Sequence, residues 1–274
     1  MTRFVNNVKT VFLLGGLMGL FAAIGGMLGE GYLLPFLIIG LITNFGAFFF
    51  SDTIAIKSMR GQEVGQDDPI YQMVDELRQK AGLPMPRVYV CPQQAPNAFA
   101  TGRSPSKAAV AVTLGAMQLL NEQEMRGVMA HELAHIKNRD TLTSTIAATI
   151  AGVLAFLAQW GFLFAGNREQ SNPFVAIGVL IIGAVGAAVI KAMISRSREF
   201  VADADGASIA GTPTGLMSAL QKLESLNQRI PMQSPNPAQN NLFIVEPFAG
   251  KTLGKLFATH PPTAQRIARL REQL

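Results

Sequence analysis

The sequence predicts an α-helical membrane protein that carries a polar α+β domain, and three observations support this fold class. Charged residues make up only 15% of the 274 residues, whereas soluble domains carry about 25%. Apolar residues gather in four long runs that are almost free of charge. The polar segments between and after these runs mix helical and strand periodicities. The composition excludes a disordered or fibrous chain, and the length suits one ordinary domain plus membrane spans.

The four apolar runs are long enough to cross a bilayer as helices, since a span needs about 20 mostly apolar residues. Their approximate limits are 11–28, 33–50, 142–165 and 174–194. Short joints at 29–32 and 166–173 make each pair a helical hairpin. The alternative for the first run is a cleaved signal peptide. No small-x-small cleavage site ends this run, and a second run follows at once, so we favour an uncleaved anchor.

The distribution of basic residues predicts the orientation of the chain. Arg3 and Lys9 precede the first run, whereas the joint at 29–32 holds no Lys or Arg. By the positive-inside rule, both termini and both polar segments face the cytoplasm. The predicted organisation is a first membrane hairpin in residues 1–50 and a second in 142–194. Segments 51–141 and 195–274 together form one cytoplasmic domain.

Charge, cysteine and motif content exclude several functional classes. The net charge of +5 comes without a dense basic run, so nucleic-acid binding is not expected. The single cysteine, Cys91, rules out an internal disulfide. The chain lacks a G-x-x-x-x-G-K-[ST] loop, so we expect no nucleotide and no ATP-driven step.

The first polar segment opens with a polar linker and then mixes helix and strand patterns. Apolar residues at helical spacing predict a helix over 70–81 that ends at Gly82. Strands are predicted at 87–90, after the turn-rich stretch 96–102, and at 108–114. Asn121 and Glu124 form a capping box that begins a further helix. Nothing in the sequence breaks this helix before the third apolar run.

The second polar segment is predicted to be mainly helical. It opens with the stretch 195–203, breaks at 211–213 and continues as a helix over 214–227. A loop rich in Pro, Asn and Gln occupies 230–250. A basic helix through Arg266 closes the chain.

The helix that Asn121 caps carries a metal-ligand pattern. His131 and His135 are four residues apart, so their rings project from one helix face about one turn apart. This spacing lets both imidazoles reach one zinc ion, with Glu132 placed to take a proton from a water molecule there. Two of the three histidines in the chain belong to this H-E-x-x-H pattern. The simpler interpretation, two solvated histidines on an amphipathic helix, does not explain their small apolar neighbours.

A catalytic zinc site usually has three protein ligands, so a third must come from elsewhere in the chain. Glu199 in the second polar segment can supply it. Asp203, one helical turn further on, can hold the far nitrogen of a histidine ligand and fix its orientation. The alternative for Glu199 is an ion pair with Arg196 or Arg198.

The motifs 131–135 and 198–203 together resemble those of the HtpX-type membrane metalloproteases, bacterial relatives of the prenyl-protein (CAAX) endopeptidases. The resemblance covers essentially the whole chain and includes the His-Pro-Pro sequence at 260–262. It implies a zincin-like α+β metalloprotease domain that holds one zinc ion per chain. It also implies an ATP-independent endopeptidase of the bacterial inner membrane that cleaves misfolded or damaged membrane proteins, with its active site on the cytoplasmic side.

The resemblance also assigns roles to residues. The metal ligands correspond to His131, His135 and Glu199, and the general base corresponds to Glu132. His260 resembles the histidine of the family's His-Pro motif, which could donate a hydrogen bond to the oxyanion. A structural role in capping the last helix is the alternative for His260.

A substrate-binding edge is implied as well. The residues that resemble it are Asn97, Ala98, Phe99 and the strand at 109–113. An edge strand can pair with an extended peptide without strict sequence choice. Arg266 is expected to pair with Asp203 or Glu124.

Three other functions use the same residues. A membrane zinc-binding or transport protein could bind the ion at His131, His135 and Glu199, but transporter sites usually lie near the bilayer midplane. A prenyl-protein endopeptidase is disfavoured by the short chain with four predicted spans. An inactive scaffold is disfavoured because Glu132 is intact.

Overall fold

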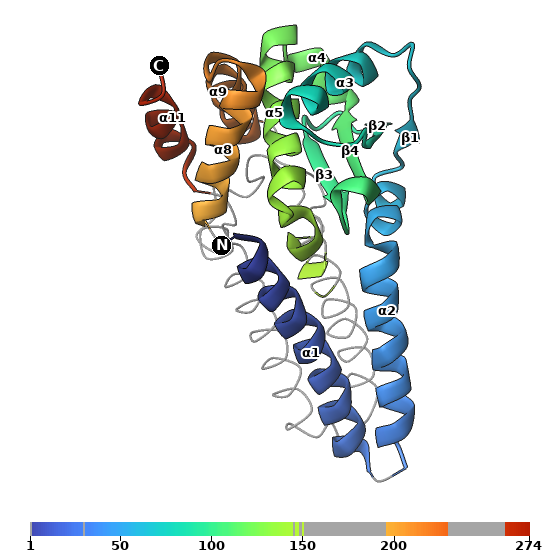
Figure 1. Ribbon diagram of the computed structural model, residues 1–274. Helices are drawn as coiled ribbons and strands as arrows, with labels where there is room; N and C mark the ends of the chain where they lie inside the picture. The colour runs from blue at the N-terminus through green and yellow to red at the C-terminus, as the bar shows by residue number, and fades with distance from the viewer. Residues whose placement is uncertain (1, 30, 145, 148–149, 151–195, 230–260) are drawn as a thin grey trace.

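The computed structural model describes residues 2–29, 31–144, 146–147, 150, 196–229 and 261–274 (Figure 1). Two long helices, α1 (Thr2–Leu28) and α2 (Leu33–Ser58), form a hairpin at one end of the molecule. A sheet and several shorter helices form a domain at the other end. The predicted second hairpin and the predicted loop at 230–250 lie almost entirely outside the described residues.

Helices α1 and α2 match the first two predicted spans. The windows Val8–Gly26 and Leu33–Phe50 are long and apolar enough to cross a membrane. Only 11% of the second window is buried inside the protein, so α2 does not resemble the core helix of a soluble domain. The two helices approach closely at Gly40, where a Cβ would stand 3.0 Å from the sulfur of Met18.

Helix α2 does not end near residue 50, where the sequence predicted a polar linker, but continues to Ser58. The reason is a second buried surface beyond the apolar run. Ala55, Ile56 and Met59 pack with Tyr89 and Phe99 against one face of the sheet. One continuous helix therefore connects the apolar hairpin with the domain.

The sheet has four strands in the order β1-β2-β4-β3. They are β1 (Gln62–Glu63), β2 (Arg87–Cys91), β3 (Ala98–Gly102) and β4 (Ala108–Thr113). β2 and β4 are parallel, whereas β1 pairs with β2, and β3 with β4, in antiparallel fashion. The strands predicted near 87–90 and 108–114 are confirmed, and the third lies within the turn-rich stretch. The two-residue β1 is too short to show a sequence pattern.

β4 is buried along its whole length because both faces of the sheet are covered. Ala109 and Ala111 belong to the cluster beneath α2, whereas Val110 and Val112 belong to the main core. The strand ends at Thr113 rather than at Leu114. The Thr113 hydroxyl accepts a hydrogen bond from the Ala116 amide and so caps the short helix α4 (Leu114–Leu119).

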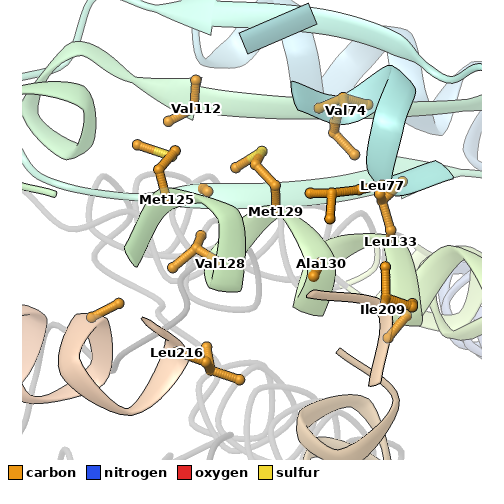
Figure 2. Close-up of a cluster of buried hydrophobic side chains, with 14 of the residues drawn as sticks. Val74, Leu77, Val112, Met125, Val128, Met129, Ala130, Leu133, Ile209 and Leu216 are labelled. Carbon is orange, nitrogen blue, oxygen red and sulfur yellow. The ribbon is translucent and has the colours of Figure 1, made fainter. Parts of the chain in front are cut away.

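Helices α3 (Pro69–Ala81) and α5 (Glu122–Asn138) pack on the other face of the sheet. Helices α8 (Arg196–Ala210) and α9 (Thr214–Arg229) pack against α5, and α11 (Thr263–Arg271) packs against α8 and α9. The predicted capping box between Asn121 and Glu124 is present at the start of α5. Figure 2 shows α5 at the centre of the core. Met129 points towards the sheet and α3, whereas Leu216 of α9 lies on the opposite side of α5.

Gly206 and Gly127 allow the backbones of α8 and α9 to pack directly against the backbone of α5. A Cβ on Gly206 of α8 would stand 2.9 Å from the Cα of His131. A Cβ on Gly127 of α5 would stand 2.4 Å from the backbone nitrogen of Leu216 in α9. Such distances exclude larger side chains unless the backbone moves. The contact at Gly206 draws α8 against the helix that carries the histidine pair.

Helix α5 stops at Asn138, although the sequence predicted that it could run on into the third apolar run. Arg139 adopts the left-handed conformation with φ of 59°, and helical residues resume at Asp140. This kink turns the chain so that Asp140 lies next to the histidine pair.

Candidate metal centre

Three side chains from α5 and α8 converge on one point. The Nε2 atoms of His131 and His135 lie 3.2 Å apart. Carboxylate oxygens of Glu199 lie 3.7 Å from the first Nε2 and 3.6 Å from the second. In a tetrahedral zinc site with bonds of 2.0–2.1 Å, neighbouring donor atoms stand about 3.3 Å apart. Two imidazoles and a carboxylate at these separations fit one zinc ion.

Each histidine has a carboxylate at its far nitrogen. Asp203 Oδ1 lies 3.0 Å from His131 Nδ1, and Asp140 Oδ2 lies 3.2 Å from His135 Nδ1. A carboxylate at Nδ1 fixes the proton there, so Nε2 presents its lone pair to the point shared with Glu199. The two rings are therefore both oriented for metal binding.

The sequence reasoning placed Asp203 in this role but missed Asp140. A helical wheel cannot find Asp140, because its position five residues after His135 does not correspond to a helical neighbour. It reaches the ring only because Arg139 breaks the helix in the left-handed conformation, which non-glycine residues rarely adopt. The only available signal was an acidic residue two positions beyond the end of the motif helix.

Arg266 of α11 lies beside the candidate ligands, with one of its nitrogens 3.4 Å from His131 Nε2, and is 1% exposed. Its Nε donates to Asp203 Oδ2 at 2.8 Å and its second nitrogen donates to Oδ1 at 2.6 Å. Of the two expected partners, Asp203 is therefore the one that Arg266 contacts. Glu124 instead accepts hydrogen bonds from Lys222 and Ser218.

The alternative ion pairs for Glu199 were Arg196 and Arg198. Arg198 lies 3.6 Å from Asp140, so this arginine is directed at the carboxylate behind His135. Glu199 is 5% exposed and has both Nε2 atoms and Arg266 within 4 Å. Glu199 is therefore a buried candidate ligand and not one partner of a surface ion pair.

Burial and charge shift the pKa of Asp203 and of His135. Burial opposes ionisation of Asp203, but Arg266 and His131 lower its pKa to about 2. Burial also opposes protonation of His135, but Glu199, Asp140 and Glu132 together raise its pKa to about 9. Asp203 is thus ionised at neutral pH, and His135 holds a proton there when no metal is bound.

The raised pKa predicts how zinc affinity depends on pH. Zinc needs the neutral imidazole, so below pH 9 a proton must leave His135 when the ion binds. We expect the apparent affinity to rise about tenfold per pH unit from pH 7 to 9 and then to level off. Competition with a chromophoric chelator at several pH values measures this slope. An affinity that stays flat between pH 7 and 9 contradicts the assignment.

The proton on His135 also affects the stability of the metal-stripped chain. Because the folded pKa lies above the usual value of about 6.5, the stabilisation is complete below pH 6.5 and is lost as the pH rises through 9. The stripped chain should therefore unfold at a lower temperature at pH 9 than at pH 7.

The remaining predicted site residues have different positions. Glu132 is 5% exposed and lies next to His131 in the chain, and its charge contributes to the raised pKa of His135. Asn97, Ala98 and Phe99 stand at the start of β3 with buried side chains. His260 lies outside the described residues.

The strand near 109–113, expected at a substrate-binding edge, is not at an edge. It is β4, which pairs with β2 on one side and β3 on the other. The last strand in the sheet order is β3, which begins with Ala98 and Phe99. Thr141, just after α5, donates to the Gly102 carbonyl at 2.9 Å and so ties the far end of β3 to the segment that follows α5.

Comparison with known proteins identifies the family. Residues 66–274 match the model of peptidase family M48. The chain belongs to this family of metalloproteases. Proteins named "Protease HtpX homolog" are similar to the M48 chain over 97% of its length. One from Desulfatibacillum aliphaticivorans is 48% identical, and the match covers 89% of that protein. One from Gemmatimonas aurantiaca is 49% identical, and the match covers 98% of that protein.

A solved structure supports the fold of the M48 chain. The crystal structure of S. mikatae Ste24p matches with a TM-score of 0.50 at 17% sequence identity. The match covers 98% of this chain and 65% of that structure. The likeness therefore extends through the helical hairpin as well as the domain with the histidine pair.

Proposed function

We propose that the chain is a zinc-dependent, ATP-independent endopeptidase that cleaves misfolded or damaged membrane proteins. The observation that carries this proposal is the convergence of His131, His135 and Glu199, whose candidate ligand atoms all lie within 4.8 Å of one another. Glu132, adjacent in sequence to the first ligand, supplies a carboxylate that a transport site would not need.

The proposed chemistry divides between the ion and the chain. Bound zinc supplies Lewis acidity towards the scissile carbonyl and makes a water molecule more acidic. Glu132 accepts the proton of the attacking water and passes it to the leaving amine. Asp203 and Asp140 hold the two imidazoles in place, and Arg266 keeps Asp203 ionised. His260 is proposed as a donor to the oxyanion.

Substrate binding is proposed at the edge strand β3. Support comes from the position of β3 at the end of the sheet order, where the strands of the described residues pair with it on one side only, so that an extended peptide could pair with the other side. Main-chain pairing gives affinity with little sequence preference. A chain without a phosphate loop cannot unfold its substrates with ATP, so they must offer a flexible segment.

The proposed location is the bacterial inner membrane, with the termini and the active site on the cytoplasmic side. Support comes from the apolar windows in α1 and α2 and from Arg3 and Lys9 near the N-terminal end of α1. The second hairpin at 142–194 would add two further spans. Cysteines introduced near Gly166 should react with a membrane-impermeant reagent from the periplasmic side.

Ligand variants test the proposal. His131→Ala and Glu199→Ala should each lower the zinc content well below one ion per chain. Each should also abolish cleavage of unfolded casein in detergent. Lys80→Ala, on the exposed surface of α3, is the matched control and should keep both. Elemental analysis and gel-based cleavage provide the two readouts. Full zinc content in either ligand variant contradicts the assignment of that ligand.

A further inference from the structure

A cavity of about 600 Å³ lies where α2 leaves its apolar window and meets the loop between β3 and β4. The loop contains the 3-10 turn Pro105–Lys107. Figure 1 shows this end of the β3–β4 hairpin facing the part of the molecule that the α1–α2 hairpin occupies. The cavity is separate from the metal centre, since none of the proposed metal ligands lines it.

The two walls of the cavity differ in chemistry. The wall from α2 carries three phenylalanines, Phe45, Phe49 and Phe50. The wall from the domain carries three basic residues, Arg87, Arg103 and Lys107. Asp52 is the single acidic residue among the lining side chains, so the cavity has a net positive charge.

The positive charge is concentrated on two of the basic residues. Asp52 Oδ2 pairs with Arg87 at 2.6 Å and largely neutralises it. Within the part of the chain that the structure describes, Arg103 and Lys107 form no ion pair. These two positive charges are therefore available to bind an anion that is not part of the described chain.

Arg103 is held at the end of the apolar window. Its guanidinium carbon lies 4.8 Å from the centre of the Phe49 ring, a favourable cation–π distance. One of its nitrogens donates to the Phe49 carbonyl at 3.5 Å. The guanidinium is thus fixed at the level where the apolar run of α2 ends, which is the depth of lipid headgroups if α2 spans the bilayer.

An exposed apolar stripe leads along α2 to this point. Ile38, Ile42, Phe45 and Phe49 follow at intervals of three and four residues, so they share one helix face. Each is between 40% and 66% exposed. Acyl chains can lie along such a stripe, whereas a free anion or an acidic peptide would leave it uncovered.

We infer that this cavity binds the phosphate group of an anionic phospholipid whose acyl chains lie along the exposed face of α2. Arginine and lysine at the cytoplasmic end of a membrane helix recognise lipid phosphates by charge and hydrogen bonding. The inference rests on the proposed insertion of α2 but not on the proposed peptidase activity. Because Arg103 directly follows β3, a lipid there would hold the proposed substrate-binding strand at the membrane surface.

Lipid retention by the full chain tests the inference. The purified protein in detergent is titrated with phosphatidylglycerol and, separately, with phosphatidylcholine of the same acyl chains, and native mass spectrometry counts retained lipids. Wild type should prefer phosphatidylglycerol. In the double variant R103Q/K107Q we expect the affinity for phosphatidylglycerol to fall roughly 30-fold, since each basic residue near an anionic lipid contributes about fivefold.

Two further variants act as controls. K80Q/R271Q removes the same charge from exposed positions on α3 and α11 and should retain phosphatidylglycerol as wild type does. R103K/K107R keeps both charges and should retain most of the preference. Equal thermal midpoints for all variants show that the fold is intact. Casein cleavage in lipid-free detergent should also be equal, so failure of the proposed peptidase would appear as absent cleavage in every sample.

Three results would overturn the inference. The first is a wild type that retains both lipids equally. The second is a preference that survives in R103Q/K107Q or is lost equally in K80Q/R271Q. The third is complete displacement of phosphatidylglycerol by millimolar inorganic phosphate, which would indicate a site for free anions.

Discussion

Replacing Glu132 with Gln is expected to abolish peptide cleavage while leaving the zinc content at the wild-type level. The amide has nearly the same shape as the carboxylate but cannot accept a proton from water. Loss of a general base typically costs about 10²–10⁴-fold in rate. The proposed ligands His131, His135 and Glu199 are untouched, so the ion should remain. Cleavage of unfolded casein and elemental analysis of the same preparation measure the two quantities.

The comparison needs a control for general damage to α5. Glu122→Gln makes the same chemical change at an exposed position in the first turn of that helix and should keep near wild-type cleavage. If E132Q cleaved as fast as wild type, Glu132 would not be the base. If E132Q lost its zinc, the lost activity would say nothing about proton transfer, and the separation of ligand and base in this account would be wrong.

Replacing Arg266 with Gln is expected to destabilise the domain strongly and to weaken zinc binding. The substitution leaves the Asp203 carboxylate buried, at 2% exposure, without its bidentate partner. Removing one partner of a buried ion pair costs about 3–5 kcal/mol. Thermal unfolding with and without zinc follows the stability, and chelator competition follows the affinity.

A double variant separates the ion pair from the role in metal binding. R266Q/D203N removes both buried charges and should recover part of the stability lost in R266Q. Zinc affinity should stay low in the double variant, because the residue behind His131 no longer carries a charge; loss of such a partner costs about 10–100-fold. R271Q, an exposed change on the same helix, should leave both quantities unchanged. Equal stability of R266Q and R271Q would contradict the account.

Several features of the candidate metal centre can be predicted from the sequence because their signals are local. The spacing of His131 and His135 depends only on helical geometry, and the capping box at Asn121 fixes where that helix begins. Asp203 follows Glu199 by one turn, so its position relative to the ligand also depends on one helix. Each of these predictions needs no knowledge of distant contacts.

Features that depend on tertiary packing were not predictable. Asp140 reaches His135 only through the left-handed Arg139, and arginine gives no sequence signal for that conformation. The extension of α2 to Ser58 reflects burial of Ala55 and Ile56 against the sheet, which a polar local sequence conceals. The interior position of β4 follows from its pairing with two strands, and strand order cannot be deduced from periodicity alone.

We propose that one zinc ion at His131, His135 and Glu199 makes this chain a peptidase. The most direct measurement strips the full chain with a chelator in detergent, restores zinc stepwise at pH 8, and follows casein cleavage and bound zinc together. We predict that cleavage is absent in the stripped protein and rises in proportion to bound zinc up to one ion per chain. Cleavage by the stripped chain, or an intact and fully zinc-loaded chain that cleaves neither casein nor an unfolded membrane protein, would contradict the claim.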